Sequence, residues 1–193
     1  MTDIVILRIF LFILTHNQYS IQIKLGVEGK YCLHFHKVEE CPNCLYKNNV
    51  IENSHQRRII VHGTHLSAVE GNILYNVRGA GIYIEDGNEM FNHINYNVVI
   101  CPFRFNDVEL HGCTVPGTSN AIADTSDNQS GIFSRAATND LVGNRAVNSF
   151  NGMLLQAVGM GRGVDNNGKV CEADARIGRL IGNTFHGHGR FGT

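Results

Sequence analysis

The sequence lacks the charge and the long apolar run that a nucleic-acid-binding or membrane-spanning protein would need. Charged residues make up 17% of the chain and leave a formal net charge of −1. No basic run is present, so nothing in the charge pattern favours nucleic acid as a partner. The apolar run at residues 4–14 is too short for a membrane helix, which needs about 20 residues. We therefore expect no nucleic-acid binding and no direct membrane insertion of the folded domain.

Tryptophan is absent, and only 3 prolines accompany 21 glycines. Glycine and the many asparagines tolerate the left-handed backbone conformations that tight turns require. No stretch shows a long helical period of apolar residues. These absences argue against a helical fold and favour short strands joined by tight turns.

A repeat of 23 residues organises the first half of the chain. Ile59-Ile60-Val61-His62 and Ile82-Tyr83-Ile84-Glu85 are matched strand-like segments at this offset. The same spacing separates the asparagines Asn49, Asn72 and Asn95. Stacked asparagine side chains can hydrogen-bond as a ladder, and a period in the low twenties is typical of a solenoid. The predicted fold is all-β, a right-handed parallel β-helix with coils of about 23 residues.

Alternation along each strand predicts a column of polar side chains on one outer face. Successive side chains of a strand face opposite sides, so the aliphatic residues fill the interior and their neighbours face outward. His36, His62 and Glu85 then stack with neighbours about 4.8 Å apart. Glu85 and Asp86 would point to opposite faces of a regular strand, so only one joins the column unless the strand ends at Glu85.

The chain divides into a short leader and one β-helix. Residues 1–20 are either a signal-like segment or an apolar segment that precedes the coils, and residues 21–193 form the β-helix. Loops are expected at residues 37–48, 101–129 and 157–176. Because residues 185–193 stop inside what looks like a new coil, we expect the chain to be part of a longer solenoid.

Six cysteines are compatible with a secreted protein that holds its loops by disulfides. Cys41 and Cys44 form a CxxC motif close to His34 and His36, from which a zinc site can be drawn. The second ligand pair that would make a zinc motif specific is missing. A loop disulfide or free thiols is therefore the favoured interpretation.

Several motifs carry a family resemblance. They are Gly29–His36, Val61–His65, Asn72–Asn76, Ile84–Glu89, Thr138–Asn144 and Leu180–His186. In order and spacing they resemble the parallel β-helix region of the G8-domain proteins. That family includes fibrocystin-like receptors and cell-surface or secreted hyaluronidase-like proteins. The resemblance covers roughly residues 21–193 and implies an extracellular or cell-surface ectodomain.

The resemblance and the polar column together imply an extracellular β-helix domain that binds or degrades an acidic polysaccharide such as hyaluronan. Histidines work as acids or bases near neutral pH, paired carboxyl groups cleave glycosidic bonds, and arginines hold carboxylates. The candidate catalytic residues are His36, His62, His65, Glu85 and Asp86. The candidate substrate-binding residues are His34, Tyr83, Arg58, Arg78 and Glu89. The same groups are also suited to a divalent cation, calcium or zinc.

A function of a different class fits the same residues. Outward histidines and glutamates on stacked coils can simply hydrogen-bond from coil to coil. The chain would then be a non-catalytic structural or glycan-binding segment of a fibrocystin-like receptor ectodomain.

Overall fold

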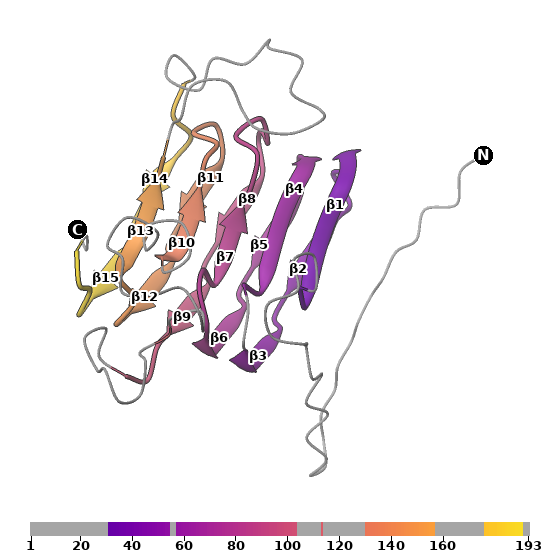
Figure 1. Ribbon diagram of the computed structural model, residues 1–193. Coiled ribbons are helices and arrows are strands. Elements are labelled where there is room, and N and C mark those ends of the chain that lie inside the picture. Colours follow the sequence, from indigo (N-terminus) through magenta and orange to yellow (C-terminus); the bar gives the residue numbers. More distant parts are fainter. Residues whose placement is uncertain (1–30, 55–56, 104–112, 114–129, 157–175, 191–193) are drawn as a thin grey trace.

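The computed structural model describes residues 31–54, 57–103, 113, 130–156 and 176–190. These residues form strands and no helix, and thus no helix that could span a membrane. Each successive set of three strands makes one coil, and each coil gives one strand to each of three parallel sheets. Figure 1 shows the coils stacked from β1 to β15. The prediction of an all-β parallel β-helix is confirmed.

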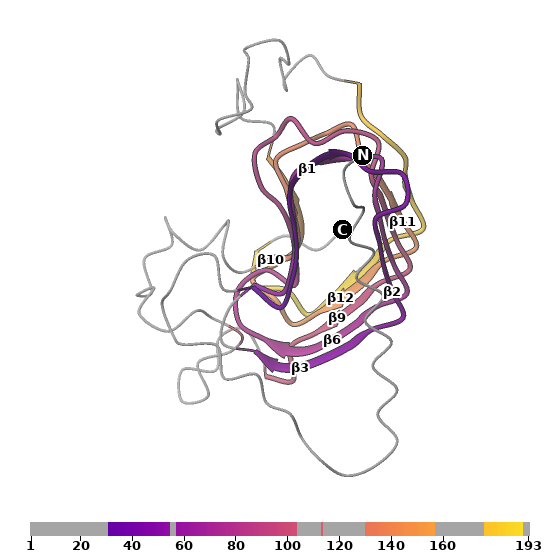
Figure 2. The same ribbon diagram turned by 90° about the vertical axis from the view of Figure 1, so that its right-hand side faces the viewer.

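Three five-stranded sheets build the helix, and Figure 2 looks along the stack, where the coils nearly superimpose. Sheet A contains β1 (Leu33–Glu40), β4 (Ile59–His65), β7 (Ile82–Ile84), β10 (Ser130–Ser134) and β13 (Asn151–Leu155). Sheet B contains β2 (Leu45–Lys47), β5 (Ala68–Glu70), β8 (His93–Asn95), β11 (Asp140–Val142) and β14 (Leu180–Ile181). Sheet C contains β3 (Val50–Ser54), β6 (Ile73–Val77), β9 (Val98–Ile100), β12 (Arg145–Val147) and β15 (Thr184–His186).

The interior is filled by rows of aliphatic side chains that stack in register. In sheet A, Ile59, Ile82 and Ile132 are direct partners on neighbouring strands, and all three are fully buried. In sheet B, Ile94 and Leu141 form part of an equivalent row. Alternation therefore assigned the inward positions correctly, because the interior accepts only every second side chain of each strand.

The connection from sheet B to sheet C has two residues in every coil. The first residue has a positive φ, and these residues are Asn48, Gly71, Tyr96, Gly143 and Gly182. The second residue is an asparagine, and these are Asn49, Asn72, Asn97, Asn144 and Asn183. A left-handed residue turns the chain sharply, and glycine adopts this conformation without the steric cost of a Cβ. Each coil therefore makes this corner with the same two-residue turn, a residue of positive φ followed by an asparagine.

The five asparagines form a hydrogen-bonded ladder between coils. Asn97 is fully buried, and its Oδ1 accepts from the backbone N–H (3.0 Å) and from Nδ2 (2.9 Å) of Asn72. Its Nδ2 donates to the carbonyl of Val69 (2.9 Å) and to Oδ1 of Asn144 (3.0 Å). The asparagine ladder was predicted, but Asn95 was wrongly assigned as its third member. Asn95 lies in β8 opposite Glu70.

Asn97 occupies the ladder position predicted for Asn95, and this difference has a local cause. Ile59 pairs with Ile82, an offset of 23 residues, whereas Ala68 pairs with His93, an offset of 25. The segment from the start of β7 to the start of β8 is therefore two residues longer than the segment from the start of β4 to the start of β5. A constant repeat cannot anticipate this insertion.

The predicted loop at residues 37–48 is shorter than expected. Strand β1 continues to Glu40 through a bulge, and β2 begins at Leu45, so that only four residues connect them. Cys41 and Cys44 close this connection as a disulfide. Their sulfurs are therefore not zinc ligands, and the disulfide interpretation is the correct one. The other predicted loops and residues 1–20 lie mostly or wholly outside the described residues.

A row of glycines lets sheet C approach sheet A closely. Gly81, Gly131 and Gly152 occupy equivalent positions at the start of the sheet A strands, and the backbone N–H of Gly81 donates to the carbonyl of Gly131 (3.0 Å). A Cβ on Gly131 would lie 2.6 Å from Cβ of Ala146 and 2.8 Å from the carbonyl oxygen of Gly152. Any larger side chain would push the two sheets apart.

Candidate functional site

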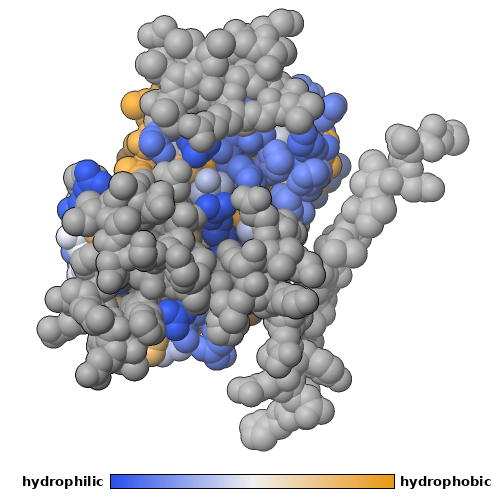
Figure 3. Space-filling view, in the orientation of Figure 1, coloured by the Kyte–Doolittle hydropathy of each residue, from blue (hydrophilic) through white to orange (hydrophobic). Residues whose placement is uncertain are grey.

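The outer face of sheet A carries two rows of side chains in register. The first row is His34, Ile60, Tyr83, Phe133 and Leu154. In the second row His36 is the direct partner of His62, and the backbone N–H of Glu85 donates to the carbonyl of Val61 (3.1 Å). The structure thus forms the predicted column of His36, His62 and Glu85. Figure 3 shows hydrophilic surface over the upper ends of β1 and β4.

Three imidazoles from two neighbouring strands meet at the start of this column. One ligand-type atom each of His34, His36 and His62 lies within 4.8 Å of the other two. The His36 ring stands edge-on to both others, with centroids 4.9 Å from His34 and 4.8 Å from His62. The His34 and His62 rings are nearly parallel at 6.0 Å. We call these three residues the histidine cluster.

Two carboxylates flank the His62 ring. Its Nε2 lies 2.9 Å from Oδ2 of Asp86, and its Nδ1 lies 3.6 Å from Oε2 of Glu85. The expectation that a regular strand would separate the two carboxylates does not apply, because β7 ends at Ile84. Beyond that residue the backbone leaves the strand, and both Glu85 and Asp86 reach the same imidazole.

The histidine cluster holds at least one neutral imidazole near neutral pH. Burial, together with the nearby His36 and His62, lowers the pKa of His34 to about 4. A neutral imidazole keeps one nitrogen lone pair available as a hydrogen-bond acceptor or a metal ligand. His34 is half-buried, whereas His36 is exposed to solvent.

Glu89 has a structural position that differs from its predicted role in substrate binding. It is fully buried, and its carboxylate accepts backbone N–H bonds from Gly63 (3.1 Å), Asp86 (2.9 Å) and Gly87 (2.8 Å). Burial raises the pKa of Glu89, although these hydrogen bonds favour its ionised form. The residue holds the segment that carries Glu85 and Asp86 against β4, and a polymer on the surface does not reach it.

His65 lies at the end of β4 and does not belong to the histidine cluster. Its Nδ1 accepts a hydrogen bond from the backbone N–H of Met90 (3.0 Å). This bond ties the end of β4 to the following coil. A catalytic role for His65 stays a prediction.

Tyr83 faces outward as predicted but is 4% exposed, which removes it from the accessible surface. Its ring stacks on Phe133 with centroids 4.8 Å apart, and the Arg57 guanidinium lies 4.0 Å above it. Ile60 and Ala80 complete this second apolar cluster on the outer side of sheet A. The first row is thus apolar beyond His34.

Of the two arginines predicted to bind substrate, Arg58 is buried and Arg78 is half-buried. Arg58 is 5% exposed, and burial lowers its pKa while the Cys32 thiol beside it acts in the opposite direction. Arg78 follows β6 and is half-buried, with its backbone N–H bonded to the carbonyl of Ser54 (2.9 Å). Arg57 and Arg135 are the arginines that the structure places over the outer face of sheet A.

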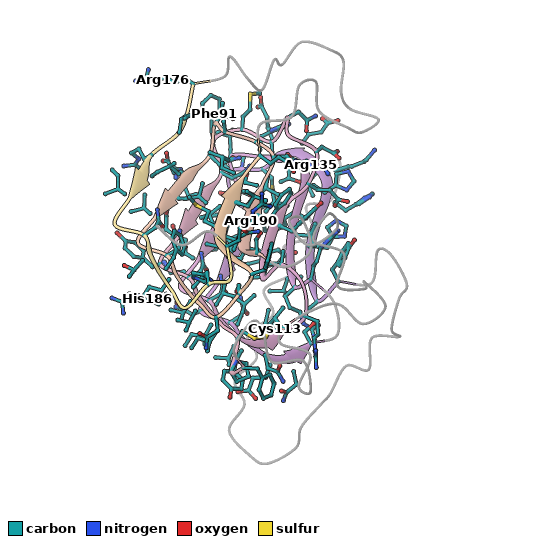
Figure 4. The ribbon with its side chains drawn as sticks, turned by 60° about the vertical axis from the view of Figure 1, so that its left-hand side comes forward. Phe91, Cys113, Arg135, Arg176, His186 and Arg190 are labelled. Atoms are coloured by element: carbon teal, nitrogen blue, oxygen red, sulfur yellow. A yellow bond between two sulfur atoms is a disulfide. The ribbon has the colours of Figure 1, made fainter. Side chains whose placement is uncertain are left out.

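Arg135 continues the second row beyond Glu85. Its backbone N–H donates to the carbonyl of Ile84 (3.2 Å), one position before Glu85, and its guanidinium lies 5.9 Å from the Phe133 ring. Figure 4 labels this residue on the sheet. The sequence offered no signal for it, because the long connection between β9 and β10 breaks the repeat.

Comparisons with known proteins agree with this fold. The CEMIP beta-helix family model matches residues 22–193. Fibrocystin-L from Mus musculus is 37% identical over 73 residues, which cover 37% of this chain and 2% of that protein. Fibrocystin-L from Homo sapiens is 25% identical over 167 residues, which cover 85% of this chain and 4% of that protein.

A G8 domain-containing protein from Dictyostelium discoideum is 24% identical over 177 residues, which cover 88% of this chain and 12% of that protein. The chain therefore spans a small part of the length of the curated relatives it matches. No solved structure matches it.

Proposed function

This chain belongs to the CEMIP beta-helix family, and on that premise we propose that it forms an extracellular domain that binds and degrades an acidic polysaccharide of the hyaluronan type. The observation that carries the proposal is the column of His36, His62 and Glu85, with Asp86 and His34 beside it. Titratable groups concentrated on one outer face are typical of functional sites.

The two carboxyl groups beside His62 supply the chemistry. Glycosidases use a pair of carboxyl groups roughly 5 to 10 Å apart, and contact with one imidazole keeps Glu85 and Asp86 close to each other. The Glu85 side chain is 29% exposed and the Asp86 side chain 8%. We therefore assign protonation of the departing glycosidic oxygen to Glu85. A water molecule attacks the anomeric carbon as that bond breaks, and His62, oriented by Asp86, takes up the proton of this water.

Positive charge on the same face supports an acidic substrate. Arg57 lies over the Tyr83 ring, and Arg135 follows Glu85 in the second row. A guanidinium binds a carboxylate through two parallel hydrogen bonds, which suits the uronic acid units of such a polymer. These two residues replace Arg58 and Arg78 in the proposal.

The extracellular location is supported by two disulfides, Cys41–Cys44 and Cys101–Cys113. Disulfides persist in oxidising compartments and are rare in the cytosol. Figure 4 labels Cys113 beside the lower strands.

A second candidate is a glycan-binding segment that does not cleave its ligand. It is favoured by the low exposure of Asp86, since a buried carboxylate bonded to a histidine can serve structure alone. The relatives named Fibrocystin-L are compatible with this candidate, which keeps the same face and the same ligand class.

The test is a depolymerisation assay on hyaluronan, run together with retention on immobilised hyaluronan. The parent chain is compared with Glu85→Gln, which keeps the side-chain shape, and with His93→Ala, whose histidine lies on sheet B. Loss of cleavage in Glu85→Gln alone, with retention intact, supports the enzyme. Retention without cleavage, weakened by Arg135→Ala, supports the binding module. Neither cleavage nor retention by the parent chain refutes the proposed function.

A further inference from the structure

We propose that His34, His36 and His62 bind one divalent transition-metal ion of the zinc class. The inference deepens the proposed function, and its relevance to a glycan rests on that function. The binding itself is argued from geometry alone.

The spacing of the three histidines suits a single ion. His34 and His36 project from the same side of β1, and His62 projects beside them from β4. Their ligand-type atoms lie within 4.8 Å of one another. Zinc–nitrogen bonds of about 2.0–2.1 Å require nitrogens roughly 3.4 Å apart in a tetrahedron. Small rotations of the rings therefore bring all three nitrogens to bonding distance.

An unsatisfied atom points to a missing partner in the cluster. Nε2 of His34 is enclosed and makes no hydrogen bond within the described part of the chain. Buried polar atoms in folded proteins nearly always have a partner. A cation shared with His36 and His62 would supply one.

The surroundings of His62 match those of a metal-bound histidine. A ligating histidine usually donates its second ring N–H to a carboxylate, which fixes the tautomer and the ring orientation. Oδ2 of Asp86 lies 2.9 Å from Nε2 of His62, and Oε2 of Glu85 lies 3.6 Å from Nδ1, so a carboxylate stands beside each nitrogen of this ring. The two carboxylates also place negative charge next to the cationic centre.

The ligand set selects the kind of metal. Imidazoles suit zinc, copper, nickel and iron, whereas calcium takes six to eight oxygen ligands. The cluster therefore favours zinc over calcium, the two cations that the sequence left open. With three protein ligands a fourth position stays open, and water bound to zinc at such a site has a pKa near 7.

The experiment measures metal uptake without glycan. Tag-free full chain is stripped with a chelator and titrated with zinc chloride by calorimetry, and cobalt chloride is used to record the coordination geometry by visible absorption. The variants are His36→Ala, Asp86→Asn and the control His93→Ala. Circular dichroism checks that each variant keeps the fold, and the exposed position of His36 makes loss of folding in that variant unexpected.

We expect one equivalent of zinc in the parent chain and in His93→Ala. His36→Ala should lose this binding, and Asp86→Asn should weaken it about 10- to 100-fold. Equal uptake by the parent chain and His36→Ala, or no uptake by the parent, would overturn the inference. Metal binding by a chain that neither retains nor cleaves hyaluronan would refute the proposed function and leave the metal site standing. Glycan retention by a chain that takes up no metal would overturn the metal site and leave the proposed function standing.

Discussion

Removing one rung from the middle of the asparagine ladder should cost far more stability than removing one at its end. Asn97→Ala deletes four side-chain hydrogen bonds, two accepted from Asn72 and two donated to Val69 and Asn144. The backbone N–H of the fully buried Asn72 then loses its acceptor. A buried donor without a partner costs about 1–3 kcal/mol, and each ordinary hydrogen bond contributes about 1 kcal/mol. We expect a loss of about 3–5 kcal/mol in the free energy of unfolding.

Asn49→Ala is the matched control within the same ladder. The half-buried Asn49 side chain donates one hydrogen bond, from Nδ2 to Oδ1 of Asn72 (2.8 Å), so its removal should cost about 0.5–1.5 kcal/mol. Urea unfolding followed by circular dichroism gives both values, with the m-value checking that the transition stays comparable. Equal costs for the two variants would refute the reasoning, because the ladder would then contribute no more at its centre than at its end.

Three further predictions concern the close approach of sheets A and C, the buried carboxylate and the outer stack. Gly131→Ala should destabilise the chain by about 1–3 kcal/mol in urea unfolding, since its Cβ would contact Ala146 at 2.6 Å; an unchanged midpoint would contradict the close approach. The fold raises the pKa of Glu89, so the folded state holds the proton of this carboxyl group more tightly than the unfolded state does. The parent chain should therefore lose stability relative to Glu89→Gln as pH rises above about 4.3. Urea unfolding at several pH values checks the sign, and a difference that does not change with pH would contradict it. Phe133→Ala should cost about 3–5 kcal/mol by thermal or urea unfolding, because the ring is fully buried; a loss below about 1 kcal/mol would show that the outer stack is dispensable.

The sequence predicted those parts of the fold that depend on a local period. Alternation identified the inward Ile59 and Ile82 and the outer column that begins with His36, because side-chain direction follows directly from strand geometry. It did not predict that the outward Tyr83 would be buried, since burial on the outer face depends on neighbours from other coils. The apolar character of Ile60 and Phe133, which flank Tyr83 in the same row, was the available signal.

The candidate site was only partly predictable for a related reason. Its members lie where strands end, and strand ends are set by tertiary contacts. The early end of β7 brings Asp86 to His62, and the buried Glu89 carboxylate fixes that segment. No pattern in the sequence separated Glu89, which supports the fold, from Glu85, which faces solvent.

The two-residue corner between sheets B and C has a consequence for how such a protein can evolve. That corner keeps the same length in all five coils, at residues 48–49, 71–72, 96–97, 143–144 and 182–183. The connections that lead into and out of sheet A range from two residues after β4 to 29 residues after β9. The connections into sheet A and those out of it begin or end at the strands whose outer face carries the histidine cluster. Insertions can therefore change the rim of this face, and so change which ligands bind there, while the invariant corner keeps the coils in register.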